Sequence, residues 1–327
     1  MKIAIVGATG EVGRMMLTCL QEANIEISEL DLYASARSKG QVLYYLDNPI
    51  IVQELDERSL LKHYDYVLFS AGAGIARSYA PIAAQTSEVV IDNSSAFRKE
   101  EQIPLVVPQI NGDLLEGYEG IVANPNCSTI QIVLPLAVLD KLFTLQKVVV
   151  STYQSVSGSG NSGIETLLKQ RKGSTAKGIY PEIIDLNVIP QIGAFQDSGF
   201  CQEEEKMHHE TRKILRKEAI AICATTVRVP VIYGHSVSVY AEFAKDVDLD
   251  MAEKHLISSA GIVYYPNSYI TPLNLGSSDD SHVCRMRYGV DHKSLAFWNV
   301  GHNVRLGAAT NAVLILLQHA RYSGRLK

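Results

Sequence analysis

The 327-residue chain is longer than one hydrophobic core usually covers, so two domains are expected. With 46% hydrophobic and 20% charged residues and a formal net charge of −5, it has the composition of a compact globular protein, with no electrostatic basis for binding nucleic acid or an anionic membrane. No apolar run reaches the roughly 18 to 20 residues of a membrane helix, and the first residues enter a strand, so we expect a cytoplasmic protein.

The first 125 residues alternate short apolar runs with helical patterns at 14–23 and 75–85. The runs are KIAIV, LDLYAS, DYVLFS, EVVID, LVVP and GIVA. This alternation predicts an α/β fold, a Rossmann-type dinucleotide-binding domain with a mostly parallel sheet.

A glycine-rich turn, GATGEVG at 7–13, joins the first strand to a helix. Glycines permit a tight turn, and a helix start can hold a pyrophosphate. The spacing of Gly7, Gly10 and Gly13 is looser than GxGxxG, so a strand-to-helix turn without a ligand is the alternative.

The second strand ends in ASARSKG, where an NAD site would place a carboxylate for the ribose 2′-hydroxyl. Ser35, Arg37 and Ser38 stand there instead. A guanidinium and hydroxyls suit a 2′-phosphate, so the cofactor is predicted to be NADP, an ordinary polar turn being the alternative.

Cys127 is the first candidate nucleophile. Pro125 and Asn126 interrupt the chain before a long apolar helical series, which places the thiol in the first turn of a helix. Free N–H groups and the helix dipole favour the thiolate there. The alternative is a buried structural cysteine.

The cysteines at 19, 127, 201, 223 and 284 are scattered and include no CxxC pair. We therefore expect no disulfide framework and no metal site. The adjacent His208 and His209 are predicted to lie on a solvated helix face.

The second half is predicted to be an α+β domain with longer, antiparallel strands. It contains the strand QKVVVSTYQ, the run TVRVPVIYGHSVSVYAEF, a helix at 203–217 and a last helix at 305–321. The glycine-rich stretch SVSGSGNSG is expected to be an active-site loop.

A thiolate beside a nicotinamide indicates aldehyde chemistry through a thioester, and a phosphate acceptor would require cations. Arg98 follows a strand end on the edge where ligands bind in such sheets. Lys206, Arg228 and His235 are further candidates, each with an ordinary surface or structural role as its alternative.

Several stretches in the same order resemble aspartate-β-semialdehyde dehydrogenase of the bacterial branch: GATGEVG, ASARSKG, VVIDNSSAFR, LVVPQIN, NPNCSTIQ, STYQSVSGSG, RVPVIYGHS and RLGAATNAV. The resemblance implies a homodimer that makes aspartate semialdehyde from 4-phospho-aspartate and NADPH, on the route to lysine, threonine and methionine. It also implies an NADP-binding domain at 1–126 and 303–327 and a catalytic and dimerisation domain at 127–302.

By this resemblance Cys127 is the nucleophile, His235 its acid–base partner and Gln154 the residue that orients the acyl intermediate. Arg98 and Lys206, assisted by Asn126, would bind phosphate, while Arg228 and Glu203 would bind the α-carboxylate and α-amino groups. The expected cofactor residues are Gly7, Thr9, Gly10, Glu11, Val12, Gly13, Ser35, Arg37, Ser38, Ser70 and Gly158.

Three places depart from the family pattern. Val237 stands where a glutamate is common, with Glu242 further along the strand, His302 replaces an aspartate, and YGVD follows CRMR. Two alternatives stay open: N-acetyl-glutamyl-phosphate reductase, whose cysteine segment typically reads GCYPT, and a non-catalytic paralogue that acts as an interaction protein.

Overall fold

The computed structural model describes residues 1–326, which form two compact units. The first consists of Met1–Asn126 and 308–326, and the second of Cys127–Gly307. Residues 303–307, which the sequence analysis assigned to the first domain, thus group with the second unit. Arg305 pairs there with Asp279, with Nη2 2.9 Å from Oδ2.

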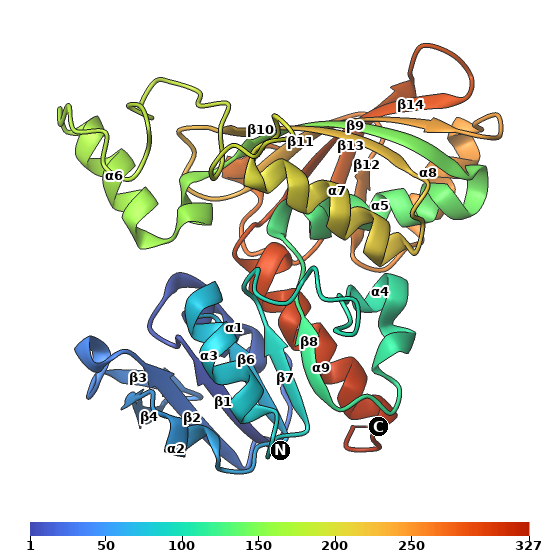
Figure 1. The fold of residues 1–327 in the computed structure, drawn as a ribbon. Helices are drawn as coiled ribbons and strands as arrows, with labels where there is room; N and C mark the ends of the chain where they lie inside the picture. Colours follow the sequence, from blue (N-terminus) through green and yellow to red (C-terminus); the bar gives the residue numbers. More distant parts are fainter. Residues whose placement is uncertain (327) are drawn as a thin grey trace. The chain divides into compact units, whose positions relative to one another are not determined.

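The first unit is built on a six-stranded sheet with the order β5-β2-β1-β6-β7-β8, in which all neighbouring strands are parallel. Its strands are β1 (Lys2–Val6), β2 (Glu29–Ala34), β5 (Gln53–Glu54), β6 (Tyr66–Phe69), β7 (Val89–Asp92) and β8 (Gly120–Ala123). A small hairpin of β3 (Val42–Tyr45) and β4 (Asn48–Ile51) accompanies it (Figure 1). The parallel sheet confirms the Rossmann-like prediction.

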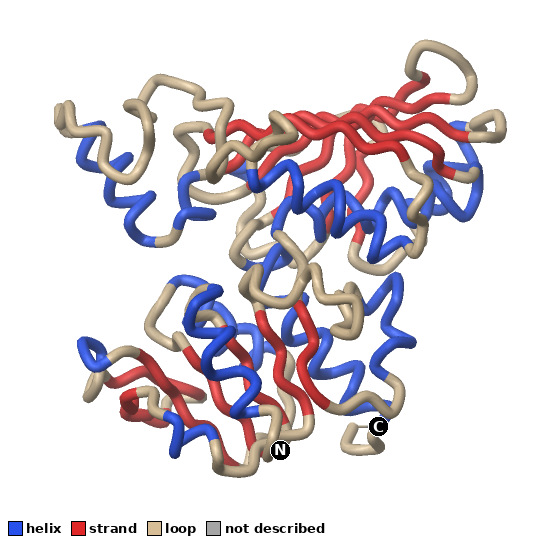
Figure 2. Tube along the Cα trace, in the orientation of Figure 1, coloured by secondary structure: helices blue, strands red, loops and turns tan. Residues whose placement is uncertain are grey.

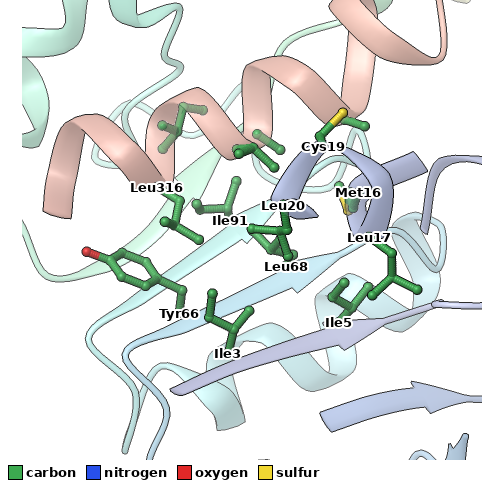
Figure 3. Close-up of a cluster of buried hydrophobic side chains, with 14 of the residues drawn as sticks. Ile3, Ile5, Met16, Leu17, Cys19, Leu20, Tyr66, Leu68, Ile91 and Leu316 are labelled. Atoms are coloured by element: carbon green, nitrogen blue, oxygen red, sulfur yellow. The ribbon is translucent and has the colours of Figure 1, made fainter. Parts of the chain in front are cut away.

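Helices cover both faces of this sheet, because alternate residues of β1 face opposite sides. Ile3 and Ile5 pack with α1 (Glu11–Glu22) and α9 (Asn311–Tyr322), and Figure 3 shows Leu316 of α9 near Tyr66 and Ile91. Ala4 and Val6 belong to the core on the other side, with α2 (Glu57–Leu60) and α3 (Ala73–Ala83). The short elements η1 (Ala36–Ser38), α4 (Pro108–Asn111) and η2 (Gly112–Leu115) complete the unit.

The second unit has a six-stranded sheet with the order β10-β9-β11-β14-β13-β12. Its strands are β9 (Leu145–Gln154), β10 (Ala221–Arg228), β11 (His235–Phe243), β12 (Ile262–Tyr265), β13 (Ser281–Tyr288) and β14 (Ser294–Gly301). Apart from the four-residue β12, the strands are long, as expected. They are not uniformly antiparallel, since β9 pairs with β10 and β12 pairs with β13 in parallel.

One face of this sheet carries the helices α5 (Cys127–Phe143), α7 (Gln202–Leu215) and α8 (Leu249–Ile257), as Figures 1 and 2 show. From Val148 to Gln154 the even-numbered residues of β9 are buried, whereas Val149 and Tyr153 are exposed. The sheet thus has one covered and one uncovered face. The remaining elements are η3 (Val156–Ser159), α6 (Asn161–Arg171), η4 (Pro272–Asn274) and the π-helix η5 (Arg305–Thr310).

Some local predictions are wrong. The run LVVP is not a strand: Leu105 forms a single bridge with Ala123, and Pro108 begins α4. The last helix does not run evenly from Arg305, because its first part is the π-helix. His208 is half-buried rather than solvated: its Nε2 accepts a hydrogen bond from the Ala224 N–H at 3.3 Å. None of the helices in residues 1–326 is long and apolar enough to cross a membrane.

Candidate active site

The glycine turn between β1 and α1 brings backbone segments so close together that side chains at Gly7 and Gly13 would not fit. A Cβ on Gly7 would lie 2.4 Å from the Ser70 carbonyl oxygen, and one on Gly13 would lie 2.2 Å from the Gly7 oxygen. Gly7 and Ser70 follow the adjacent strands β1 and β6, where the strand order reverses direction, the usual nucleotide position in such sheets. The bare backbone at this point fits a dinucleotide pyrophosphate at the start of α1.

The remaining residues of the expected cofactor site surround this turn. Gly10 is the N-cap of α1 and provides no side-chain cap to the first turn, which contains Glu11 and Val12. The Thr9 hydroxyl donates to Ser38 Oγ at 3.2 Å. The glycine turn and the end of β2 therefore meet, and Ser35 and Arg37 are exposed there.

Arg98 is buried at the carboxyl edge of β7 and β8. Its Nε donates to the Asn124 carbonyl at 2.8 Å, and its Nη2 to the Asn93 carbonyl at 3.0 Å. These bonds fix the guanidinium against the backbone of Asn124, which stands three residues before Cys127 in the sequence. Asn126 is buried and directly precedes that cysteine.

Cys127 is the first residue of α5 and is half-buried. The helix is apolar on all sides, with residues such as Ile130, Val133 and Leu136 buried, which explains why it lies inside its unit. A Cβ on Gly307 would lie 2.6 Å from the Cys127 Cβ, so backbone packs directly against the cysteine. The expected helix start is confirmed.

Three strand ends bring polar side chains to one edge of the second sheet. Arg228 ends β10 and pairs with Gln154, which ends β9, while His235 begins the antiparallel strand β11. All three side chains are buried. The alternation along the strands directs them to the face that carries α5 and α7.

α5 is bonded to the start of β11. Gln131, one helical turn after Cys127, donates from Nε2 to the His235 carbonyl at 3.4 Å and to Asn299 Oδ1 at 2.9 Å. This places the beginning of the cysteine helix beside the histidine.

His235 is completely buried, and its Nε2 has no hydrogen-bond partner within the described chain. Burial, followed by the positive charge of Arg228, lowers the pKa of His235 to about 3. The ring is therefore neutral near pH 7. An unpartnered, buried ring nitrogen is a polar group available to a ligand.

Arg228 is directed by the loop after β9. Its Nη1 donates to the Ser155 carbonyl at 2.6 Å, and a Cβ on Gly158 would lie 2.9 Å from the same nitrogen and 3.3 Å from His235 Nε2. On α7, Lys206 Nζ lies 2.9 Å from Glu203 Oε2. The charges of Glu203 and Arg228 both act on His235, so the cation and the carboxylate belong to the same site.

Val237 and Glu242 lie on opposite faces of β11. Val237 is buried on the helix-covered face, whereas Glu242 lies on the uncovered face, with Oε2 2.8 Å from Lys147 Nζ. Glu242 thus does not supply the carboxylate that Val237 replaces.

The structure brings the expected residues together in two sets. One is the glycine turn with Thr9, Ser38 and Ser70, and the other is Cys127, Gln154, Glu203, Arg228 and His235. The sequence analysis missed Ser155 and Asn303, which bond to each other beside His235. Ser155 follows Gln154 directly, whereas the partners of Asn303 lie far from it in the sequence.

Among residues 1–326, one group has the composition of a metal site: His63, Asp65 and Glu88, whose ligating atoms lie within 4.8 Å of one another. Arg325 forms ion pairs with both carboxylates. The group is therefore already charge-compensated by the protein itself.

Two family models match this chain. "Semialdehyde dehydrogenase, NAD binding domain" matches residues 2–118, and "Semialdehyde dehydrogenase, dimerisation domain" matches residues 135–306. The fold and the cysteine site therefore define an oxidoreductase of the semialdehyde dehydrogenase class, with an NAD(P)-binding domain.

The similarity extends to individual proteins. The chain is 42% identical over 327 residues to the aspartate-semialdehyde dehydrogenase of Aquifex aeolicus, with 96% of each chain covered. It is also similar to the crystal structure of aspartate semialdehyde dehydrogenase II from Vibrio cholerae, with a TM-score of 0.93, 39% identity and 98% of each chain covered. A second structure of the Vibrio enzyme is described as complexed with ASA. The chain belongs to the aspartate-semialdehyde dehydrogenase family.

Proposed function

We propose that this protein catalyses the reductive dephosphorylation of 4-phospho-L-aspartate to L-aspartate 4-semialdehyde. The observation that carries the proposal is the convergence of Gln154, Arg228 and His235 at three strand ends, next to the helix that starts at Cys127. The family relationship, and the Vibrio relative described with ASA, support the choice of substrate.

Cys127 is the nucleophile in this proposal. Its sulfur attacks the acyl carbon, a C–S bond forms, and the C–O bond to phosphate breaks to leave a thioester. The start of α5 favours the negative sulfur. When bound, NADPH would supply the hydride that reduces the thioester carbonyl, and Cys127 would then leave as the C–S bond breaks to release the semialdehyde.

The other residues bind and orient. His235 is the acid–base partner of Cys127, and Gln154 orients the acyl group. Arg228 binds the α-carboxylate, since a guanidinium gives orientation as well as attraction, and Glu203 binds the α-ammonium. Arg98, Lys206 and Asn126 bind the phosphate.

A coupled assay tests the proposal: purified protein with aspartate semialdehyde, phosphate and NADP, followed by NADPH absorbance. We expect turnover that Cys127→Ala abolishes and that Cys223→Ala, a change at an exposed cysteine, leaves intact. Turnover with N-acetyl-glutamate semialdehyde instead would indicate the longer-substrate reductase. Absence of turnover with both would indicate the non-catalytic paralogue.

For the cofactor we propose NADP rather than NAD. Arg37 is exposed at the end of β2, close to Ser38, which is bonded to the glycine turn. The guanidinium would attract a 2′-phosphate, and no carboxylate stands at 35–38 to repel it. Gly158, the remaining residue of the expected cofactor set, lies beside Arg228 and His235.

Arg37→Ala should weaken NADP binding by about 10-fold or more and leave NAD binding nearly unchanged, because a charged hydrogen bond contributes about 1.5–3 kcal/mol. Lys39→Ala is the matched control, since Lys39 is a cation of the same loop that pairs with Glu54. Fluorescence titration with each cofactor measures the difference. Equal losses for NADP and NAD would remove Arg37 from the site.

The uncovered sheet face supports a homodimer. Val149 and Tyr153 are 38% and 39% exposed, and the Tyr153 ring lies 5.3 Å from that of Trp298. Apolar side chains exposed on a sheet face favour an interface there. Light scattering in solution should therefore give the mass of two chains.

The five free thiols fit the expected cytoplasmic location.

A further inference from the structure

A proline inside the cysteine helix α5 withdraws one hydrogen bond from it. In an α-helix each carbonyl accepts from the N–H four residues later, and proline has no N–H. Pro135 lies inside α5, so it cannot donate to the carbonyl of Gln131, which its side chain also crowds. Gln131 is only 1% exposed. Its carbonyl therefore needs a donor from outside the helix.

Ser281, the first residue of β13, supplies that donor. Its hydroxyl donates to the Gln131 carbonyl oxygen at 2.7 Å. Ser281 Oγ in turn accepts from Asn299 Nδ2 at 2.7 Å, and Asn299 Oδ1 accepts from Gln131 Nε2 at 2.9 Å. Ser281 and Asn299 are completely buried. The three residues thus form a closed network between α5, β13 and β14.

The protons of this network have defined acceptors. Asn299 Nδ2 also donates to the His282 carbonyl at 3.2 Å, and Gln131 Nε2 to the His235 carbonyl at 3.4 Å. A carbonyl oxygen can only accept, so neither amide group can be reversed. The single hydroxyl proton of Ser281 is then left for the Gln131 carbonyl. The network therefore has one arrangement.

The network acts on the first turn of α5 through Gln131. In the helix, the Gln131 N–H is the donor to the carbonyl of Cys127, four residues earlier. Gln131 closes this turn while its carbonyl and its side chain are bonded to the sheet. The position of the Cys127 sulfur, and the field of the helix start that favours its thiolate, both depend on this turn.

We propose that Ser281 and Asn299 are positioning residues that replace the hydrogen bond missing at Pro135 and so hold the first turn of α5, with Cys127, against the sheet. Their effect passes through Gln131. The inference rests on the proposed function, in which Cys127 is the nucleophile.

The first test is alkylation of Cys127 by iodoacetamide as a function of pH, with the modified peptide quantified by mass spectrometry. The thiolate is the reactive form, so the midpoint of the profile reports the pKa of this thiol. Ser281→Ala should raise the midpoint by about half a pH unit, the order of a helix-start contribution. It should also lower kcat by about 10-fold with little change in KM, because a misplaced nucleophile reacts slowly.

Asn299→Asp should change both quantities in the same direction, because it offers the Ser281 hydroxyl a second acceptor. An unchanged profile in either variant would refute the role of the residue replaced. Alkylation requires no turnover, so it tests the network even if the proposed reaction is not catalysed.

Pro135→Ala provides the decisive comparison, because it restores the backbone N–H that proline lacks. Alone it should leave the alkylation profile nearly unchanged. Combined with Ser281→Ala it should recover most of the lost kcat and return the midpoint, since the Gln131 carbonyl then has a donor within α5. A double variant as impaired as Ser281→Ala alone would overturn the proposal. If Ser281→Ala does not fold, the double variant should fold, and its failure to do so would be equally contrary.

Ser294→Ala is the matched control. Ser294 is also a completely buried serine of this sheet, but its hydroxyl donates to the Asp291 carbonyl at 3.1 Å, in the turn before β14. This variant should lower the melting temperature without moving the alkylation profile or kcat. Equal shifts for Ser281→Ala and Ser294→Ala would indicate a general loss of stability and refute the specific role.

Discussion

The replacement of Gly158 by alanine adds one methyl group between Arg228 and His235. The new Cβ would lie 2.9 Å from Arg228 Nη1 and 3.3 Å from both Nε2 and Cε1 of His235. Ordinary contacts between such atoms are near 3.5–4.0 Å, so Arg228 must move by about half an ångström or more. Its bond to the Ser155 carbonyl, 2.6 Å long, opposes that movement.

The size of the effect follows from that bond. A hydrogen bond to a charged group contributes about 1.5–3 kcal/mol, and each 1.4 kcal/mol corresponds to a factor of ten in binding. Gly158→Ala should therefore raise KM for aspartate semialdehyde by about 10- to 100-fold.

Initial rates of NADPH formation at varied semialdehyde concentration give KM and kcat, and a thermal unfolding curve reports the fold. The control is Ser159→Ala, which changes the same turn without adding a Cβ. A folded Gly158→Ala protein with normal KM and kcat would show that Arg228 is not the carboxylate ligand.

Two other perturbations test the fold and its pH dependence. Gly13→Ala should lower the melting temperature and abolish NADP binding, because its Cβ would lie 2.2 Å from the Gly7 oxygen and 2.8 Å from the Ala8 Cα. Gly74→Ala is the control, since nothing lies within 4 Å of the Cβ that it adds. Equal melting temperatures of the two variants would contradict the steric argument. Because the pKa of His235 is lowered to about 3 in the folded protein, its ring takes up a proton below about pH 6.5 in the unfolded chain but not in the native one. The contribution of this group to the free energy of unfolding is therefore complete above about pH 6.5 and falls below it. Urea unfolding from pH 7 to pH 4.5 should show a loss of up to about 1.4 kcal/mol per pH unit from this group, absent in His235→Asn, and an equal slope in both proteins would refute the assignment.

Local signals predicted much of the fold. The breakers Pro125 and Asn126 before an apolar series located the start of α5 at Cys127, since helix starts depend on neighbouring residues. The glycine turn after β1 was equally local.

Features that depend on distant contacts could not be predicted in the same way. The π-helix at 305–310 begins beside Cys127, which Gly307 contacts across about 180 residues of sequence. The sequence neighbours of His208 are typical of a surface residue, because its contact with the Ala224 N–H exists only once β10 lies beside its helix. Asn303 carries no pattern of its own, because its bonds to Ser155, Ser157 and Gly234 exist only after the strands have paired.

The placement of α9 in the first unit has a consequence for synthesis of the chain. Its residues Val313, Ile315 and Leu316 belong to the same core as Ile3 and Ile5, which the ribosome delivers about 300 residues earlier. The amino-terminal sheet therefore keeps one apolar side covered only in part, by α1, while the inserted segment 127–307 emerges and can fold first. A chaperone that shields that side during translation would act on the oldest part of the nascent polypeptide rather than the newest.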